Sequence, residues 1–313
     1  MKELHINKRI IKKRKKESNS INKNGHKKNN KVLKIYIKNR NKNIDKNEKN
    51  NEIDKNIKSM YEEKDKVKII RNCKNNDNIF DFIDIKYKKY FLENKDNTSS
   101  NSSHFIFFES INAYELKKHN ISTKLFNIIL DITKNNMKNL YNETNFLNKG
   151  WSDKIKMEEL KNDKCKLILG FLKNNNKIKN EEEYNFLDII KSNDKKKIDN
   201  YLYNYKLVCF VHYRLIPDYN PNQKNIICYL FEIQVIPNYT KLGLGKHLIS
   251  MLENLCKSVK LKKILCTVLK KNIKAMSFYK NKCCFEMDEN SPDNFISDGS
   301  KSCEYEILKK VIV

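Results

Sequence analysis

The sequence predicts an α/β domain with one central mixed β-sheet flanked by helices, preceded by a basic extension. Over residues 79–313, short apolar runs typical of strands alternate with longer amphipathic stretches typical of helices. The run IICYLFEIQVI at 226–236 is apolar at both alternating positions, which indicates a strand buried on both faces. Residues 1–78 form the predicted extension, mostly disordered, because the first sixty have few aromatic residues and no sustained apolar period.

The first half of the predicted domain begins with apolar runs at 79–92 and 104–109, which are hydrophobic enough to join a core. A helix is expected to begin at Ser122, a capping residue type, and to carry apolar side chains at helical spacing as far as Tyr141. A short helix over 152–160 and strands over 165–172 and 207–216 follow. The charged, Asn-rich stretch 173–205 between these strands is interpreted as a polar insertion in a surface hairpin.

The second half continues from the buried strand at 226–236, which Pro237 ends. Leucines at 244, 248, 252 and 255 then give the stripe of an amphipathic helix. A strand over 263–269, a helix over 273–279 and a last strand over 304–308 complete the predicted order.

The composition excludes some classes of protein. The net charge is +26, from 64 Lys and Arg against 38 Asp and Glu, and 59 of the basic residues are lysines, so much of the charge reflects a bias of the whole sequence. No long apolar segment predicts a membrane span, and the N-terminus lacks the apolar run of a signal peptide. Nine cysteines with no CxxC pair indicate reduced thiols in the cytoplasm or nucleus.

A basic cluster, KRIIKKRKK, begins at Lys8. Such a cluster can serve as a nuclear address or contact nucleic-acid phosphates, but composition bias explains it about equally well.

A glycine-containing loop, TKLGLGK at 240–246, stands between the buried strand and the helix that follows. Two glycines let a backbone approach a ligand, and a helix start offers N–H groups and a positive dipole end to phosphate. The spacing fits neither a P-loop nor the dinucleotide-binding fingerprint, and an ordinary tight turn is the alternative.

The order of strand, KLGLGK loop, helix, strand KILCTVL and the spacing Asn272-x-x-Ala275-x-x-Phe278-Tyr279 resembles the GNAT acetyltransferase superfamily. Within it, the chain is most similar to NatD-type N-terminal acetyltransferases, which modify the N-terminus shared by histones four and two-A. FEMDENSP at 285–292 and CEYEIL at 303–308 select this subfamily. The resemblance covers about residues 122–313 outside the insertion. It implies a GNAT fold over 79–313, acetyl-CoA as co-substrate and no metal.

The resemblance also implies the residues that bind acetyl-CoA. The pyrophosphate would lie on the backbone of the loop at 241–246, and a β-bulge at Gln234 and Val235 would let the strand pair with the pantetheine arm. The family has Arg or Gln where this chain has Thr240, and Ser where it has Asn290. The implied cofactor residues are Ile233, Gln234, Val235, Lys241, Leu242, Gly243, Leu244, Gly245, Lys246, Asn272 and Asn290.

Two residues are predicted to handle protons. Glu232 is a carboxylate inside an apolar strand, where burial without a partner favours its protonated form and suits it to act as a base for an ammonium nucleophile. The alternative is that Glu232 points outward or pairs with a lysine. Tyr279 matches the phenol that, by the resemblance, protonates the leaving thiolate.

The resemblance further implies the pocket for the acceptor peptide. An acidic loop at 286–298 would complement a basic histone tail, although it could equally be a solvated loop. The implied substrate-binding residues are Tyr141, Trp151, Asp218, Phe231, Thr267 and Tyr305.

The resulting prediction is an N-terminal α-acetyltransferase that is a monomer in the nucleus and cytoplasm, acts on a histone tail and makes weak nucleic-acid or chromatin contacts through its basic N-terminus. One alternative is a GNAT enzyme that acetylates lysine or small amines. Another is a basic chromatin- or RNA-binding protein with an inactive GNAT-like domain.

Overall fold

The computed structural model describes residues 78–92, 104–146, 149–173, 185–192, 194–219, 225–295 and 302–313. All of these except Lys149 belong to one compact unit. The predicted disorder of 1–78 and the basic cluster at Lys8 therefore lie, Asn78 excepted, outside the described residues. Within the described part, no helix has the length and apolarity needed to cross a bilayer.

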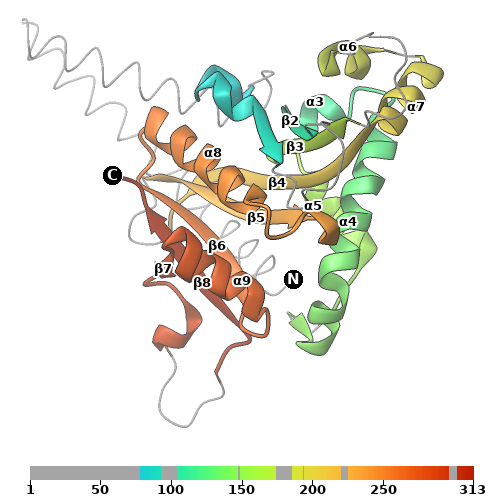
Figure 1. Ribbon diagram of the computed structural model, residues 1–313. Coiled ribbons are helices and arrows are strands. Elements are labelled where there is room, and N and C mark those ends of the chain that lie inside the picture. Colours follow the sequence, from blue (N-terminus) through green and yellow to red (C-terminus); the bar gives the residue numbers. More distant parts are fainter. Residues whose placement is uncertain are drawn as a thin grey trace, which may run out of the picture. The chain divides into compact units, whose positions relative to one another are not determined.

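A mixed sheet of eight strands organises the unit, in the order β1-β2-β3-β4-β5-β6-β8-β7 (Figure 1). Neighbouring strands run antiparallel except for β5 and β6, which are parallel. The strands are β1 (Lys89–Leu92), β2 (His104–Asn112), β3 (Lys166–Lys173), β4 (Tyr205–Pro217), β5 (Ile226–Val235), β6 (Lys263–Leu269), β7 (Glu286–Met287) and β8 (Tyr305–Val311). Four of the five strands predicted after residue 160 are confirmed within two residues, and the last one extends to Val311, three residues beyond its predicted end.

Helices cover both faces of this sheet. The helices are α3 (Ala113–Leu116), α4 (Ser122–Glu143), α5 (Asp153–Leu160), α6 (Phe186–Lys191), α7 (Lys195–Asn204), α8 (Leu244–Ser258) and α9 (Ile273–Ser277). A π-helical turn, Phe278–Lys282, extends α9, and two 3₁₀ turns, Ile79–Asp81 and Ile85–Lys88, precede β1. The helix predicted from Ser122 begins there, but its N-cap is Ile121 and no side chain caps it.

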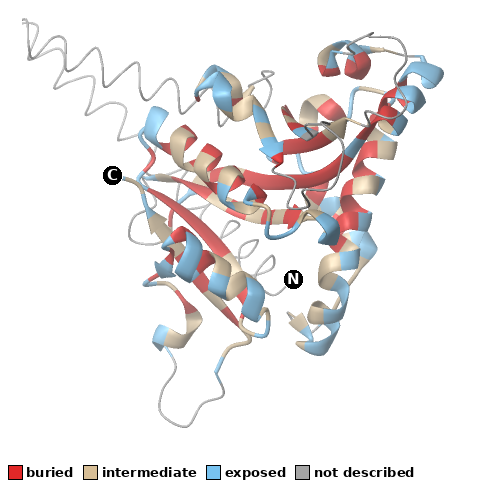
Figure 2. Cartoon of the chain, in the orientation of Figure 1, coloured by how far each residue is buried: buried red, intermediate tan, exposed pale blue. Residues whose placement is uncertain are grey.

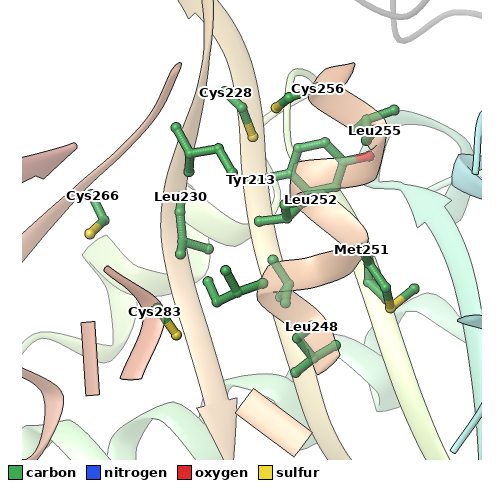
Figure 3. Packing of buried hydrophobic residues seen from close by; sticks show 14 of the residues in the cluster. Tyr213, Cys228, Leu230, Leu248, Met251, Leu252, Leu255, Cys256, Cys266 and Cys283 are labelled. Carbon is green, nitrogen blue, oxygen red and sulfur yellow. The ribbon is translucent and has the colours of Figure 1, made fainter. Parts of the chain in front are cut away.

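Two clusters of buried residues lie between the helices and the sheet, and Figure 2 colours the buried residues red. On one face α8 packs on β4, β5 and β6 through residues that include Leu248, Leu252 and Leu230 (Figure 3). On the other face, α4 and the insertion helices pack on β2, β3 and β4 through residues that include Phe126 and Phe171. Among the eight described cysteines, all free, six are buried, Cys303 is half-buried and Cys284 is exposed.

The insertion at 173–205 is partly folded, which its polar composition did not indicate. Its helices α6 and α7 bury Phe186, Ile190 and Tyr201 against the sheet. The ring of Phe171 in β3 lies 5.5 Å from Phe186 and 5.7 Å from Tyr201, centroid to centroid. It joins the adjacent antiparallel strands β3 and β4, as expected of a hairpin insertion, but it also extends the core.

A β-bulge in β5 decides which side chains face α4. Glu232 pairs with His212 and Leu230 with Tyr213, so Phe231 is the extra residue. The prediction of a bulge at Gln234 and Val235 is wrong, because both continue the regular pairing with β4. The bulge shifts the alternation of side chains by one residue, and Phe231 and Glu232 consequently lie on the same face of the sheet.

Candidate active site

The strands β5 and β6 separate at the centre of the sheet. They pair only from Cys228 to Leu230 and from Ile264 to Cys266, although β5 continues to Val235 and β6 to Leu269. Beyond Leu230, the described residues provide no strand partner on this side of β5. The backbone of 231–235 is therefore an open strand edge, to which an extended ligand can bond.

The loop 241–246 follows this open edge and leads into α8. Lys241 and Gly243 have positive φ angles of 63° and 84°. Gly243 is the N-cap of α8, and no side chain caps the helix. The first N–H groups of α8 are left without side-chain partners, which suits an anionic ligand such as the pyrophosphate of acetyl-CoA.

Tyr90 of β1 contacts the loop at Leu242. The sequence did not indicate this contact, because 152 residues separate the two. The Tyr90 hydroxyl donates a hydrogen bond of 2.8 Å to the carbonyl oxygen of Leu242. A Cβ atom at Gly243 would come within 2.2 Å of the same hydroxyl, and one at Gly245 within 2.9 Å of the Phe278 ring. Both glycines therefore permit close packing of the loop against the rest of the domain.

Thr240, where the family has Arg or Gln, does not replace that side chain. Its hydroxyl donates to the carbonyl oxygen of Pro237 at 2.8 Å and so serves the turn itself. The exposed side chains of Lys241 and Lys246 are the cations that the loop offers.

The two asparagines predicted to bind the cofactor lie in different places. Asn272 follows β6 and caps α9, its side-chain oxygen accepting from the N–H of Ala275 at 3.1 Å. Asn290 lies beyond β7, where its amide and backbone N–H groups both donate to Asp288. Because β6 and β8 stand between β5 and β7 in the sheet, the structure does not bring Asn290 to the other predicted cofactor residues.

Glu232 is buried, with 5% of its side chain exposed, and it pairs with a lysine. Lys156 of α5 donates to one carboxylate oxygen at 2.6 Å, and the Gln234 amide donates to the other at 2.7 Å. Gln234 in turn accepts from the Asn136 amide of α4 at 2.9 Å. The sequence left two alternatives to a free base, a Glu232 that points outward and one that pairs with a lysine. The structure shows the pair with a lysine.

Lys156 is as buried as its partner, with 8% of its side chain exposed, and it also contacts Glu159 at 2.8 Å. Burial works to lower the pKa of Lys156, but the carboxylates of Glu232 and Glu159 hold that pKa well above its ordinary value. Lys156 is therefore an ammonium ion inside the site. The sequence reasoning missed it, because one lysine among 59 gives no signal.

An aromatic cluster lies beside this ion pair and gathers three of the predicted substrate residues. The ring centroid of Tyr141 is 5.6 Å from that of Trp151 and 5.0 Å from that of Phe146. Phe146 reaches Tyr305 of β8 at 5.9 Å, edge to face. The ammonium of Lys156 lies 5.5 Å from the centre of the Tyr141 ring. Phe146, which the sequence reasoning missed, joins α4 to β8 across the separated strands.

Phe231 and Thr267, also predicted to bind substrate, are fixed by neighbouring side chains. The Phe231 ring stacks on His212 at 4.8 Å and has the Arg214 guanidinium 4.1 Å from its centre. The Thr267 hydroxyl is hydrogen-bonded to the Tyr229 hydroxyl at 2.6 Å. Both residues therefore present a defined surface beside the point where β5 and β6 separate.

His212, beneath the Phe231 ring, is fully buried. Its Nε2 accepts from Arg214, so its Nδ1 carries the proton of a neutral ring, and that nitrogen has no hydrogen-bond partner among the described residues. Burial, then the charges of Arg214 and Lys156, hold the pKa of His212 well below its ordinary value.

Tyr279, the predicted acid, lies in the π-helical turn and packs between Phe278 and Phe285, each ring centroid 5.2 Å away. Burial raises the pKa of Tyr279 well above its ordinary value, so the phenol keeps its proton at neutral pH.

Asp218, implied to bind substrate, and the described carboxylates of the acidic loop form ion pairs with lysines of the chain. Lys263 bridges Asp218 at 3.2 Å, Asp288 at 3.2 Å and Glu289 at 3.3 Å. The hydrogen bond from Lys309 is the main cause that lowers the pKa of Glu289 to about 2. The chain's own lysines thus neutralise these carboxylates. Asp298 lies outside the described residues.

No cluster of three or more His, Cys, Asp or Glu side chains suited to a metal ion occurs in the described part of the chain. The expectation of a metal-free site stays a prediction.

The eight-stranded mixed sheet, with parallel strands that separate beside an uncapped helix start, is a GNAT fold. Residues 163–284 match the model of the acetyltransferase (GNAT) family. The matched stretch carries Glu232 and the loop 241–246.

Several solved structures are similar to the chain at low sequence identity. Arabidopsis thaliana NAA60 with a bisubstrate analogue is 12% identical, with a TM-score of 0.40, over 66% of this chain and 99% of that one. The ribosomal-protein-S18-alanine N-acetyltransferase of Escherichia coli is 17% identical, with a TM-score of 0.31, over 52% and 78%. Tetrahymena GCN5 is 11% identical, with a TM-score of 0.36, over 63% and 91%. Sequence identities and TM-scores this low give no information about the substrate of the chain.

Proposed function

We propose that the chain transfers the acetyl group of acetyl-CoA to the N-terminal α-amine of a protein. The observation that carries the proposal is the position of Glu232, a buried carboxylate next to the open edge of β5 and beside the aromatic cluster of Tyr141, Phe146 and Tyr305. An extended N-terminus suits a site with an aromatic lining and a buried carboxylate, because the chain end enters first and brings its amine to the base.

The proposed reaction is direct attack. The neutral amine bonds to the thioester carbonyl carbon, the carbon–sulfur bond breaks, and the sulfur leaves with the bonding electron pair. Glu232, directly or through water, takes the proton that the nitrogen loses, and Tyr279 is the proposed donor to the thiolate. The open backbone of 233–235 would bind and polarise the thioester, and the N–H groups of 244–246 would hold the pyrophosphate. No cysteine is required.

The acceptor that we propose is the N-terminus shared by histones four and two-A, reached in the nucleus and cytoplasm by a monomeric enzyme. This assignment rests on the resemblance of FEMDENSP at 285–292 and CEYEIL at 303–308 to NatD-type sequences. The basic N-terminus would add weak contacts to chromatin or nucleic acid.

One assay tests the proposal. The full chain is incubated with acetyl-CoA and a Ser-Gly-Arg-Gly peptide, beside the same peptide with a blocked α-amine and a blocked peptide that carries an internal lysine. We expect acetylation of the free α-amine alone, and a fall in kcat of about 10²–10⁴ for Glu232→Gln. Transfer to the lysine of the blocked peptide would favour a lysine acetyltransferase. Acetyl-CoA binding without transfer to any amine would favour an inactive binding protein.

A further inference from the structure

The carboxylate of Glu232, on which the proposed reaction depends, is paired with the buried ammonium group of Lys156. Lys156 Nζ lies 2.6 Å from Glu232 Oε1, and both side chains are at least nine-tenths buried. The lysine comes from α5 and the glutamate from β5, 76 residues further along the chain. A contact this short between buried partners is not an incidental surface ion pair.

Other ionisable groups surround Glu232, but Lys156 is the cation that contacts it. Tyr141 and Tyr279 keep their protons, since burial raises the pKa of each, and His212 is neutral. Arg214 donates to His212 and to the carbonyl oxygen of Glu159. The charged or titratable groups around Glu232 are therefore Tyr141 from α4, Lys156 and Glu159 from α5, His212 and Arg214 from β4, and Tyr279 from the π-helical turn.

We propose that Lys156 is a positioning residue for acetyl transfer, which holds Glu232 as a carboxylate toward the acceptor and cancels its charge so that the acceptor amine reacts in its neutral form. This inference rests on the proposed function. The inference goes beyond the proposed function because it assigns a role to Lys156. In the proposed reaction this residue contacts neither the thioester nor the attacking nitrogen.

Two physical effects support this role, and loss of Lys156 would shift the pH–rate profile in the same direction through both. Without the lysine, the buried carboxylate of Glu232 would take up a proton at higher pH and lose its ability to act as a base. An uncompensated carboxylate would also stabilise the α-ammonium form of the acceptor, whose ordinary pKa is near 8, and so delay its deprotonation. Both effects move the rising limb of the pH–rate profile to higher pH.

The experiment compares profiles of kcat and of kcat/KM against pH for the full chain and three variants, because kcat reports the groups of the enzyme–substrate complex. Lys156→Met removes the charge and keeps the length, Lys156→Arg keeps a cation, and Lys154→Met changes an exposed lysine on the same helix. We expect the rising limb of Lys156→Met to move up by at least about one pH unit, with a loss of about tenfold at pH 7 that is recovered at higher pH. Lys156→Arg and Lys154→Met should keep the wild-type limb. A purely structural role for Lys156 would lower the rate equally at every pH, and that result would overturn the proposal.

A second measurement needs neither catalysis nor a folded Lys156 variant. Infrared difference spectra between the wild-type protein and Glu232→Gln report the protonation of the Glu232 carboxyl group. We expect the band of an ionised carboxylate in the wild-type protein, because Glu232 pairs with the Lys156 ammonium. A protonated carboxyl band near pH 7 would overturn the proposal even if the enzyme proved active. An ionised Glu232 in a protein that acetylates no amine would instead contradict the proposed function and leave the hold of Lys156 on Glu232 supported.

Discussion

At the scale of single residues, the loop's own Gly243 and the distant side chain of Tyr90 together set the shape of the loop 241–246. Gly243 has a left-handed backbone and leaves room for the Tyr90 hydroxyl, which bonds to the carbonyl oxygen of Leu242. A substitution at Gly243 would therefore strain the backbone and displace Tyr90 at the same time. Tyr90 itself is the cleaner position at which to test the loop.

We expect Tyr90→Phe to weaken acetyl-CoA binding by about 2–10-fold, because it removes one hydrogen bond of about 0.5–1.5 kcal/mol and keeps the ring. Isothermal titration calorimetry measures the change in Kd, and kcat at saturating acetyl-CoA should stay close to the wild-type value. Tyr87→Phe is the matched control, since its hydroxyl accepts from Asn254 of α8 at 2.8 Å and does not contact the loop. Equal affinities for wild-type and Tyr90→Phe protein would show that the contact of Tyr90 with the loop is dispensable.

At the scale of elements, ion pairs tie the ends of strands together on the outer half of the sheet. Lys263, the first residue of β6, holds Asp218 at the end of β4 and Asp288 after β7. The side chains of these two aspartates are 5% and 0% exposed. Removing the cation from buried carboxylates costs far more free energy than removing it from exposed ones.

We therefore expect Lys263→Met to lower the free energy of unfolding by about 3–5 kcal/mol at pH 7, measured by urea denaturation. Lys309→Met is the control, because its partner Glu289 has 53% of its side chain exposed, and such pairs contribute about 0–1 kcal/mol. Similar losses for the two variants would mean that Asp218 and Asp288 find other partners or water.

At the scale of the whole molecule, periodicity predicted the elements well and their side-chain contacts poorly. The stripe of Leu244 to Leu255 and the apolar run at 226–236 are local patterns, and both formed the predicted elements. The bulge at Phe231 depends on how β5 aligns with His212 of another strand, which no local pattern encodes. The pairing of Glu232 with Lys156 is likewise a contact between residues far apart in the sequence.

The site shows the same division between local and non-local information. Tyr141, Trp151 and Tyr305 were implied by resemblance, and the structure brings them together through Phe146. Asn290 was implied in the same way, but it bonds to Asp288 at the far edge of the sheet. Resemblance transfers positions along the chain, whereas tertiary contacts decide which of them meet.

The last prediction concerns how much of the N-terminal half the proposed acetyl-CoA site needs. A chain that begins at residue 61 should bind acetyl-CoA and acetylate the peptide almost as well as the full chain, because the first sixty residues have no apolar pattern that could join a core. A chain that begins at residue 93 should lose acetyl-CoA binding. It lacks Tyr90, the buried Ile79 and Ile83, and Tyr87, whose backbone oxygen accepts from His247 of α8. Calorimetry and thermal unfolding distinguish the two chains. Loss of binding on removal of only the first sixty residues would show that the functional domain begins earlier, and retained binding in the shorter chain would contradict the role assigned to Tyr90.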